Sequence, residues 1–175
     1  MKKAILISIR PKWVAKILNG EKTLEIRKSM PKCDLPIDVY IYCTKDKNQL
    51  VRCQEKVWGY YKHTKGALKS YFNGKVVAKF TLNKVEKINS YFEPEQWYMT
   101  RELGGRKLME KSCLSFSKLD DYLFGRDGCA WHIENLEIFD EPKELSEFYT
   151  AKTNKLPRYL FPLTRAPQSW VYIEV

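Results

Sequence analysis

One stretch near the start of the chain, residues 5–27 (ILISIRPKWVAKILNGEKTLEIR), constrains the fold more than any other. Its first part alternates, with Ile5, Ile7 and Ile9 on one face and Ser8 and Arg10 on the other. This period of two is typical of a β-strand with one buried side. The stretch therefore predicts a first strand over residues 4–10.

A short helix is expected directly after this strand. Pro11 suits the first turn of a helix, where its missing N–H costs nothing. Apolar residues recur at helical spacing, and Gly20 is a plausible left-handed residue just beyond the end of the helix. The side expected to face the core consists of Trp13, Val14, Ile17 and Leu18.

A second strand follows over residues 23–27. Leu24 and Ile26 are expected to face the core, with Glu25 and Arg27 on the opposite side. The strand, helix and strand would then present several polar groups that could converge on one cleft. These groups are Ser8, Arg10, Lys22, Thr23, Glu25 and Arg27.

The same stretch resembles the ASCH family of the PUA-like superfamily, in its phage and bacterial type. The matching residues are the strand with SIRP, the helix ending in NG, and then G-x-K-x-x-E-x-R from Gly20 to Arg27. The segments 130–148 and 166–175 are similar to the closing strands of such proteins. The resemblance implies a mainly β, α+β fold, a small closed barrel with a helix beside the cleft, and a nucleic-acid or nucleobase ligand.

Other parts of the chain also indicate a β-rich fold. Strands are expected over 76–85 and 129–139, with a bulge near Asn135 where the alternation changes phase. The last strand, 169–175, would pair with the first and close a barrel. Ser117 is the expected cap of a short helix that extends to Phe124.

The length of 175 residues and the hydrophobic share of 44% suit one folded domain. We expect a single ASCH-like domain over 1–175, with a basic, aromatic-rich insertion at about 45–75 and a surface insertion at about 92–128. There are 31 lysines and arginines against 21 acidic residues, a formal net charge of +10. This charge favours polyanion partners, nucleic acid first, although many small basic proteins are merely soluble.

The segment 45–75 carries eight basic residues against Asp46 and Glu55. Lys62, Lys65 and Lys69 lie among aromatic residues. Such an arrangement can bind a single nucleic-acid strand through charge and base stacking. The alternative is that the aromatics are core residues beneath a solvated basic face.

The five cysteines lack C-x-x-C spacing and only two histidines are present, so no metal site and no cofactor is expected. Scattered thiols favour a reducing, cytoplasmic location. No apolar run reaches the roughly 20 residues that span a bilayer, so no membrane partner is expected. The composition leaves the oligomeric state open, and a monomer is assumed.

Lys22, Thr23, Glu25 and Arg27 are the leading candidates for chemistry. In a binding site, Lys22 and Arg27 would hold a phosphate while Glu25 accepts hydrogen bonds from a base edge. In a catalytic site, a desolvated Lys22 would act as general base, Glu25 would relay the proton and Arg27 would stabilise negative charge. The plainer alternative is a strand with surface ion pairs, each worth under about 1 kcal/mol.

The resemblance adds a specific reaction to these alternatives. One ASCH branch hydrolyses N4-acetylcytidine with a lysine in the place of Lys22, a threonine nucleophile and a separate glutamate. In this chain the position that matches the threonine holds Glu25, and Thr23 lies two residues earlier. This departure weakens the amidohydrolase reading. Other members have been proposed as nucleases or RNA-binding modules.

Two further residues are candidates for ligand contact. His132 is expected on a strand near Trp131 or Trp170, as a catalytic group or as a hydrogen-bonded structural residue. Trp170 shares a face with Tyr172 and would form one wall for a stacked base or else fill the barrel.

The sequence thus favours a module that binds RNA, single-stranded DNA or a modified nucleobase at the G-x-K-x-x-E-x-R motif. The alternatives are a hydrolase that acts on a modified nucleoside or an RNA phosphodiester, and a phage-type interaction protein that blocks a host factor.

Overall fold

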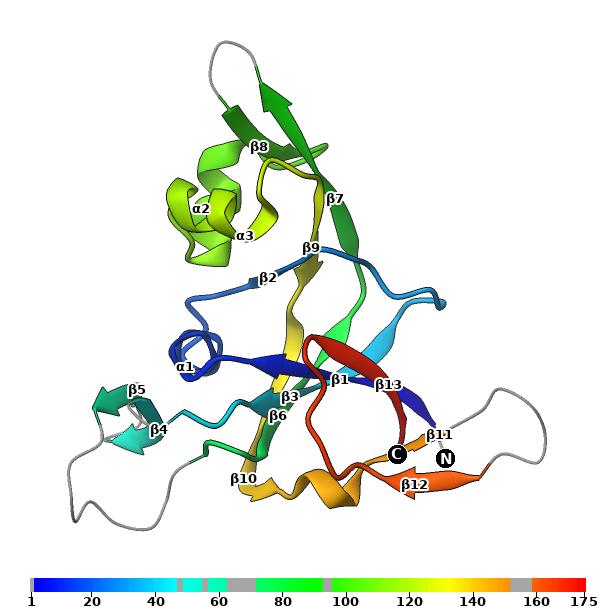
Figure 1. Ribbon diagram of the computed structural model, residues 1–175. Coiled ribbons are helices and arrows are strands. Elements are labelled where there is room, and N and C mark those ends of the chain that lie inside the picture. The colour runs from blue at the N-terminus through cyan, green and yellow to red at the C-terminus, as the bar shows by residue number, and fades with distance from the viewer. Residues whose placement is uncertain (1, 47–48, 55–56, 63–71, 93–95, 152–158) are drawn as a thin grey trace. The chain divides into compact units, whose positions relative to one another are not determined.

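The computed structural model describes residues 2–46, 49–54, 57–62, 72–92, 96–151 and 159–175. It is rich in strands, with short helices between them (Figure 1). In chain order the elements are β1 (Lys3–Ile9), α1 (Pro11–Leu18), β2 (Leu24–Arg27), β3 (Ile37–Cys43), β4 (Gln49–Gln54), β5 (Val57–Lys62), β6 (Val76–Leu82), β7 (Val85–Phe92), β8 (Gln96–Thr100), α2 (Gly105–Ser112), α3 (Phe116–Leu123), β9 (Gly128–His132), β10 (Glu134–Lys143), the 3₁₀ turn η1 (Leu145–Glu147), β11 (Tyr149–Ala151), β12 (Leu160–Pro162) and β13 (Trp170–Glu174). The predicted mainly β, α+β class is confirmed.

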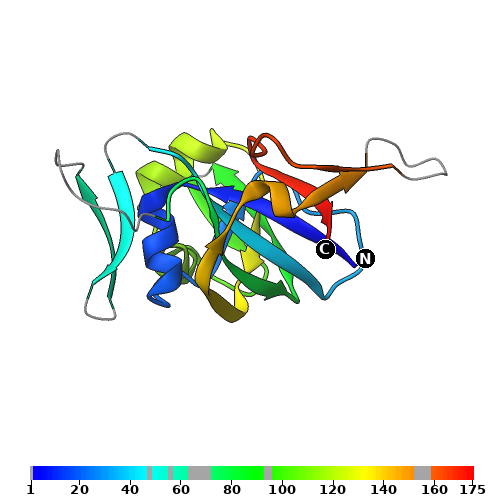
Figure 2. The same ribbon diagram turned by 90° about the horizontal axis from the view of Figure 1, so that it is seen from below.

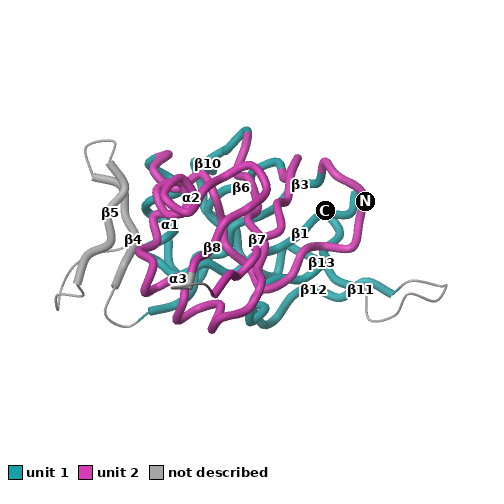
Figure 3. Tube along the Cα trace, turned by 90° about the horizontal axis from the view of Figure 1, so that it is seen from above, with its two compact units in different colours: residues 1–19, 37–81, 135–175 teal, residues 20–36, 82–134 magenta. Residues whose placement is uncertain are grey.

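The chain divides into two compact units, coloured separately in Figure 3. The first unit comprises residues 1–19, 37–81 and 135–175, and the second comprises residues 20–36 and 82–134. Each unit is discontinuous in sequence. The single-domain boundaries and the two insertions stay predictions.

The first unit is built on a seven-stranded sheet with the order β10-β6-β3-β1-β13-β11-β12. β3 runs parallel to β1, and β13 runs antiparallel to it with Ile5 opposite Tyr172. Figure 2 shows β1 and β13 alongside one another. The predicted pairing of the first and last strands is therefore confirmed, whereas closure of a barrel stays a prediction.

β1 lies in the middle of this sheet, and this position corrects one expectation. Every residue from Ala4 to Ile9 is buried, on both faces of the strand. A central strand that is covered on both sides carries continuous rather than alternating burial. Its Ala4 and Leu6 pack in a core cluster with Tyr42, Phe148 and Ile173.

The predicted helix after β1 is present as α1. Arg10 has the extended backbone of an N-cap residue, and Pro11 occupies the first turn. Asn19 is the C-cap and Gly20 follows with φ +75°, the left-handed conformation that glycine adopts without steric cost. Val14, Ile17 and Leu18 are buried as predicted, whereas Trp13 is half-buried.

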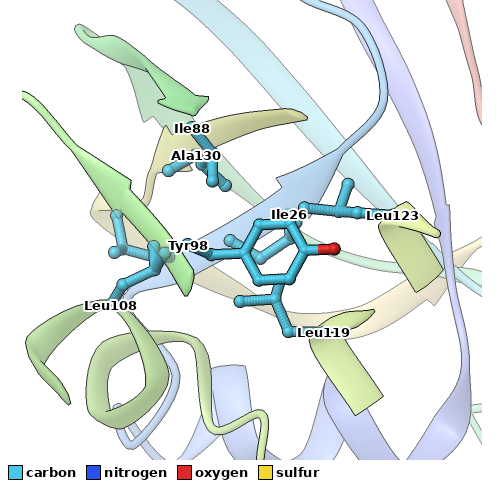
Figure 4. Close-up of a cluster of buried hydrophobic side chains, with 8 residues drawn as sticks. Ile26, Ile88, Tyr98, Leu108, Leu119, Leu123 and Ala130 are labelled. Atoms are coloured by element: carbon cyan, nitrogen blue, oxygen red, sulfur yellow. The ribbon is translucent and has the colours of Figure 1, made fainter. Parts of the chain in front are cut away.

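The second unit is built on a four-stranded sheet with the order β2-β9-β7-β8. β9 pairs antiparallel with β2 on one side and with β7 on the other. Its core joins this sheet to α2 and α3, and Figure 4 shows Tyr98 at the centre of that cluster. The buried members are Leu24, Ile26, Ile88, Tyr98, Leu108, Leu119, Leu123 and Ala130.

Two expectations about this unit are corrected. The segment 92–128 does not lie wholly at the surface, because Tyr98 and Leu108 from it are buried. The cap of α3 is Ser115 rather than Ser117, since the Ser115 side chain accepts a hydrogen bond from the backbone N–H of Lys118. Eight residues give too few helical turns for the spacing to fix the first residue of a helix. The predicted cap therefore differs from the observed one by less than one turn.

The predicted strand over 129–139 is divided in two. β9 ends at His132 and belongs to the four-stranded sheet, whereas β10 begins at Glu134 and belongs to the seven-stranded sheet. Asn135 has φ +48°, close to the predicted irregularity. The change of phase in the sequence thus marks the place where the chain changes sheets.

Candidate functional site

A cluster of three charged side chains lies at the start of β2, within the second unit. Lys22, Glu25 and Arg27 are all buried, with exposed fractions of 3%, 8% and 8%. Glu25 lies between the two cations: Oε2 is 3.3 Å from Lys22 Nζ, and Oε1 is 2.9 Å from Arg27 NH2. The alternation pattern predicted these polar groups but placed them on an open face, whereas the structure buries all four residues of β2.

Lys22 uses its ammonium group to complete the end of helix α2. Nζ donates to the carbonyl oxygens of Leu24, at 2.7 Å, and Ser112, at 2.8 Å. Ser112 is the last residue of α2, and the final carbonyls of a helix have no partner within the helix. The Thr23 N–H donates to the next orphan carbonyl, that of Lys111, at 2.9 Å. The cation also suits the negative end of the helix dipole.

The three acceptors around Lys22 Nζ match the three N–H bonds of an ammonium group. Burial lowers the pKa of Lys22, and the neighbouring Glu25 carboxylate opposes that shift. Cys113, the half-buried C-cap residue of α2, lies beside this group and donates from Sγ to the Glu21 carbonyl at 3.4 Å. The Lys22 ammonium therefore links Glu25 to the last residue of α2.

Arg27 is anchored from a second direction by α3. The Tyr122 hydroxyl interacts with the Arg27 side chain and with the backbone of Lys28. Burial raises the pKa of Tyr122, and the Arg27 charge partly offsets the effect. The Lys28 ammonium lies over the Tyr122 ring, 5.3 Å from its centroid. The side chains of Arg27 and Glu25 keep about a tenth of their surface exposed, 9% and 10%, against 2% for Lys22.

A second polar cluster lies on the same sheet and contains His132. Its Nε2 is 2.6 Å from Oε1 of Glu86, a buried residue of β7. Thr100 donates from Oγ1 to the other oxygen of Glu86, and Lys84 Nζ lies 3.4 Å from the carboxylate. Burial pushes the pKa of Glu86 upward, but Thr100, His132 and Lys84 together outweigh it and hold the pKa below the usual 4.5.

The strand register shows which faces these groups occupy. Glu25 lies opposite Trp131, whereas Leu24 lies opposite His132. His132 therefore shares a face with Leu24, and Glu25 has the other face. The structure pairs His132 with Glu86 rather than with the residues of the motif.

The remaining predicted contacts belong to the first unit. Ser8 is buried and donates from Oγ to the Pro167 carbonyl at 2.7 Å. Arg10 is exposed at the start of α1. Trp170 is half-buried and packs edge-on against Tyr172, with ring centroids 5.3 Å apart. Lys65 and Lys69 lie outside the described residues, as does the side chain of Lys62 in β5.

Within the described ranges, no group of three or more potential ligand side chains is placed to hold a metal ion. None of the helices in those ranges is long and apolar enough to cross a membrane.

Comparison with known proteins identifies the family. The model of the ASCH domain matches residues 7–143, which is most of the chain and includes the whole Lys22–Glu25–Arg27 cluster. The chain belongs to the ASCH domain family. Its PUA-like fold, expected from the motif, follows from that membership.

Solved structures support the same fold for this ASCH domain. The crystal structure of an ASCH protein from Zymomonas mobilis is similar with a TM-score of 0.55 and 17% identity, over 98% of this chain and 87% of that one. A tyrosine-to-phenylalanine mutant of the Zymomonas mobilis protein gives a TM-score of 0.56 and 17% identity, over 99% and 91%. No curated protein sequence matches the chain.

Sequence reasoning missed three parts of these clusters. Glu86 and Thr100 lie 46 and 32 residues from His132 in the chain, so no local pattern connects them with it. Tyr122 lies within the short helix expected to extend to Phe124, but helical spacing gives no sign of its contact with Arg27. The acceptor at Ser112 is a backbone carbonyl, for which side-chain patterns carry no signal.

Proposed function

We propose that this ASCH domain is a nucleic-acid-binding module, with RNA as the first candidate, and that the Lys22–Glu25–Arg27 cluster holds one nucleobase or nucleotide. The observation that carries the proposal is the charge of this cluster. Two cations surround one carboxylate, and all three residues are more than nine-tenths buried. A guanidinium beside a carboxylate offers both the donors that bind a phosphate and the acceptor that binds a base amino group.

The small exposed parts of the Glu25 and Arg27 side chains suggest a role for each residue of the cluster. Arg27 would donate to a phosphate or to base acceptors, because a guanidinium binds such groups through a fixed fork of donors. Glu25 would accept hydrogen bonds from a base amino group. Lys22 would position Glu25 without contacting the ligand, since its three donors are directed to Leu24, Ser112 and Glu25.

The distribution of charge along the chain also supports a polyanionic ligand. The first unit has 19 basic against 9 acidic residues, whereas the second has 12 of each. All of the net charge of +10 therefore belongs to the first unit. A concentrated positive potential speeds the encounter with a nucleic acid and raises its affinity at low salt.

The direct test is filter binding with labelled RNA, single-stranded DNA and free nucleosides. Arg27→Lys loses the guanidinium fork and is expected to weaken binding by roughly 10- to 100-fold, the loss typical of a hydrogen bond to a charged group. Glu25→Gln keeps the shape but exchanges an acceptor for a donor, so it is expected to change which base is preferred.

The matched control is Glu137→Gln, which alters a carboxylate that pairs with Lys79 on an exposed part of the first unit. It should leave base preference unchanged. If folded Arg27→Lys and Glu25→Gln proteins bind every ligand as the wild type does, the cluster is structural and the proposal fails.

A hydrolase that acts on an N-acylated nucleoside is the second candidate, favoured by the lowered pKa of Lys22. Three features weaken it. The ammonium form satisfies three acceptors, Glu25 occupies the nucleophile's position, and Thr23 is exposed. Release of acetate from N4-acetylcytidine that disappears in Thr23→Val would support it. The interaction-protein alternative rests on segment 45–75, which lies largely outside the described residues.

A further inference from the structure

The β7–β8 hairpin carries an exposed aromatic surface on its outward face. Ile88, Tyr98 and Thr100 point inward and are buried. Side chains alternate along a strand, so their neighbours point to the other face. Tyr91, Trp97 and Met99 on that outward face are 49%, 48% and 39% exposed. They add little to the core of the unit, because the inward residues already supply it.

The strand register brings the two rings together. Tyr91 lies directly opposite Trp97, and Asn89 lies opposite Met99. Side chains that face each other across antiparallel strands have Cβ atoms about 5 Å apart. The outward face therefore presents two adjacent rings, a thioether and an amide on one rigid pair of strands.

Two cations adjoin this surface. Lys87 occupies the same face of β7 by alternation and forms an exposed ion pair with Asp127 at 3.1 Å. Arg101 follows the last residue of β8 and is exposed. Exposed ion pairs such as Lys87–Asp127 contribute little to stability, so binding of a phosphate by Lys87 would cost little. Cations are thus available at the end of the hairpin away from its turn.

We propose that the outward face of β7–β8, formed by Tyr91, Trp97, Met99 and Asn89, is a stacking platform for the bases of a single-stranded nucleic acid. Aromatic side chains on a sheet surface stack unpaired bases, and nearby cations hold the phosphates. The platform rests on the proposed function and extends it: the buried cluster holds one nucleotide, whereas the hairpin holds others of the same strand.

The test compares single-stranded RNA of about twelve nucleotides with a mononucleotide, in the full chain. Trp97→Ala should weaken binding of the oligonucleotide by roughly 5- to 100-fold, as expected for the loss of one stacked base. The affinity for the mononucleotide should stay unchanged. Trp97→Phe should restore most of the affinity because it keeps a ring. The slope of log affinity against log salt should stay constant in both, since stacking releases no counterions.

Phe124→Ala is the matched control, because Phe124 is 79% exposed but follows α3 and is not part of the hairpin. Arg101→Ala should reduce the salt slope by roughly 0.7, one phosphate contact on a single strand. Circular dichroism confirms that each variant is folded.

The outcomes separate the platform from the proposed function. If the wild type binds neither RNA nor mononucleotide, both fail. If the wild type binds RNA and Trp97→Ala binds it equally well, the platform alone is overturned. If Trp97→Ala instead abolishes self-association in sedimentation and keeps its RNA affinity, the surface serves a second copy of this chain and the platform is likewise overturned.

Discussion

The two units differ in their net charge and in whether their charged side chains are buried. The first has an excess of ten positive charges and a sheet whose central strand β1 is buried on both faces. The second is neutral in total, yet it buries Lys22, Glu25 and Arg27 beside α2 and pairs Glu86 with His132. Surface charge acts over about 10 Å and depends on salt. Buried charge acts locally and depends on partners, so the units should respond differently to substitution.

The largest expected effect is on the stability of the second unit. Glu25→Ala leaves two buried cations without their shared carboxylate and should lower the free energy of unfolding by about 3–5 kcal/mol, as breaking a buried ion pair does. Urea denaturation followed by circular dichroism measures the change.

The control for that loss is Glu137→Ala in the first unit, which removes an exposed partner of Lys79 and should cost about 1 kcal/mol or less. Equal losses in the two variants would mean that the difference in charge burial has no energetic consequence.

The next effect concerns the attraction of the first unit for nucleic acid. Lys62, Lys65 and Lys69 changed together to Ala should reduce the slope of log affinity against log salt by about two, at roughly 0.7 per phosphate contact on a single strand. A filter-binding series in salt measures it.

The comparison variant removes the same charge from the second unit, by changing Arg106, Lys107 and Lys111 on α2 to Ala. All three are exposed, and the slope should stay nearly constant. A larger change in this variant than in the Lys62 set would show that the phosphate contacts lie on α2 rather than in the segment 45–75.

Sequence reasoning recovered the local features and lost the long-range ones. The alternating and helical spacings in residues 5–27 predicted β1, α1 and β2 in order, and Gly20 took its expected left-handed conformation. It could not predict that Lys22 satisfies a helix end 90 residues away, at Ser112. Such a contact depends on which elements are neighbours in space, and no local period encodes that.

The segment 92–128 illustrates the same limit. Its proline, glycines and charges indicate surface, but Tyr98 and Leu108 are buried because α2 and α3 supply one side of a small core. A few apolar residues in short helices suffice for this, and they are too few to give a clear period.

A smaller effect is expected from one hydroxyl in that core. Tyr98 donates to Asp120 at 2.6 Å and accepts from the Gly125 N–H at 2.9 Å. Tyr98→Phe breaks both bonds and should cost about 1–3 kcal/mol in urea denaturation. Tyr42→Phe in the core cluster of the first unit should be nearly neutral, so a comparable cost there would contradict the special role of Tyr98.

The smallest effect at neutral pH concerns Glu86. Its folded-state pKa lies below 4.5, so its ionised form stabilises the unit above that pH, and the contribution is lost as the pH falls through the folded-state pKa. Between pH 6 and pH 3, the temperature of thermal unfolding should therefore fall more steeply with pH in the wild type than in Glu86→Gln. Parallel curves would show that the contacts with Thr100 and His132 do not stabilise the charged form.

The position of β13 in the seven-stranded sheet sets the order in which this protein can assemble. β13 lies between β1 and β11, although it is the last of these strands in the chain. During synthesis β1 can pair with β3 early, but its other edge must wait for residues 170–174. The residues of the second unit are all available some 40 residues sooner. A ribosome-bound chain would thus hold an open strand edge until residues 170–174 emerge, and loss of those residues would divide the sheet through its middle.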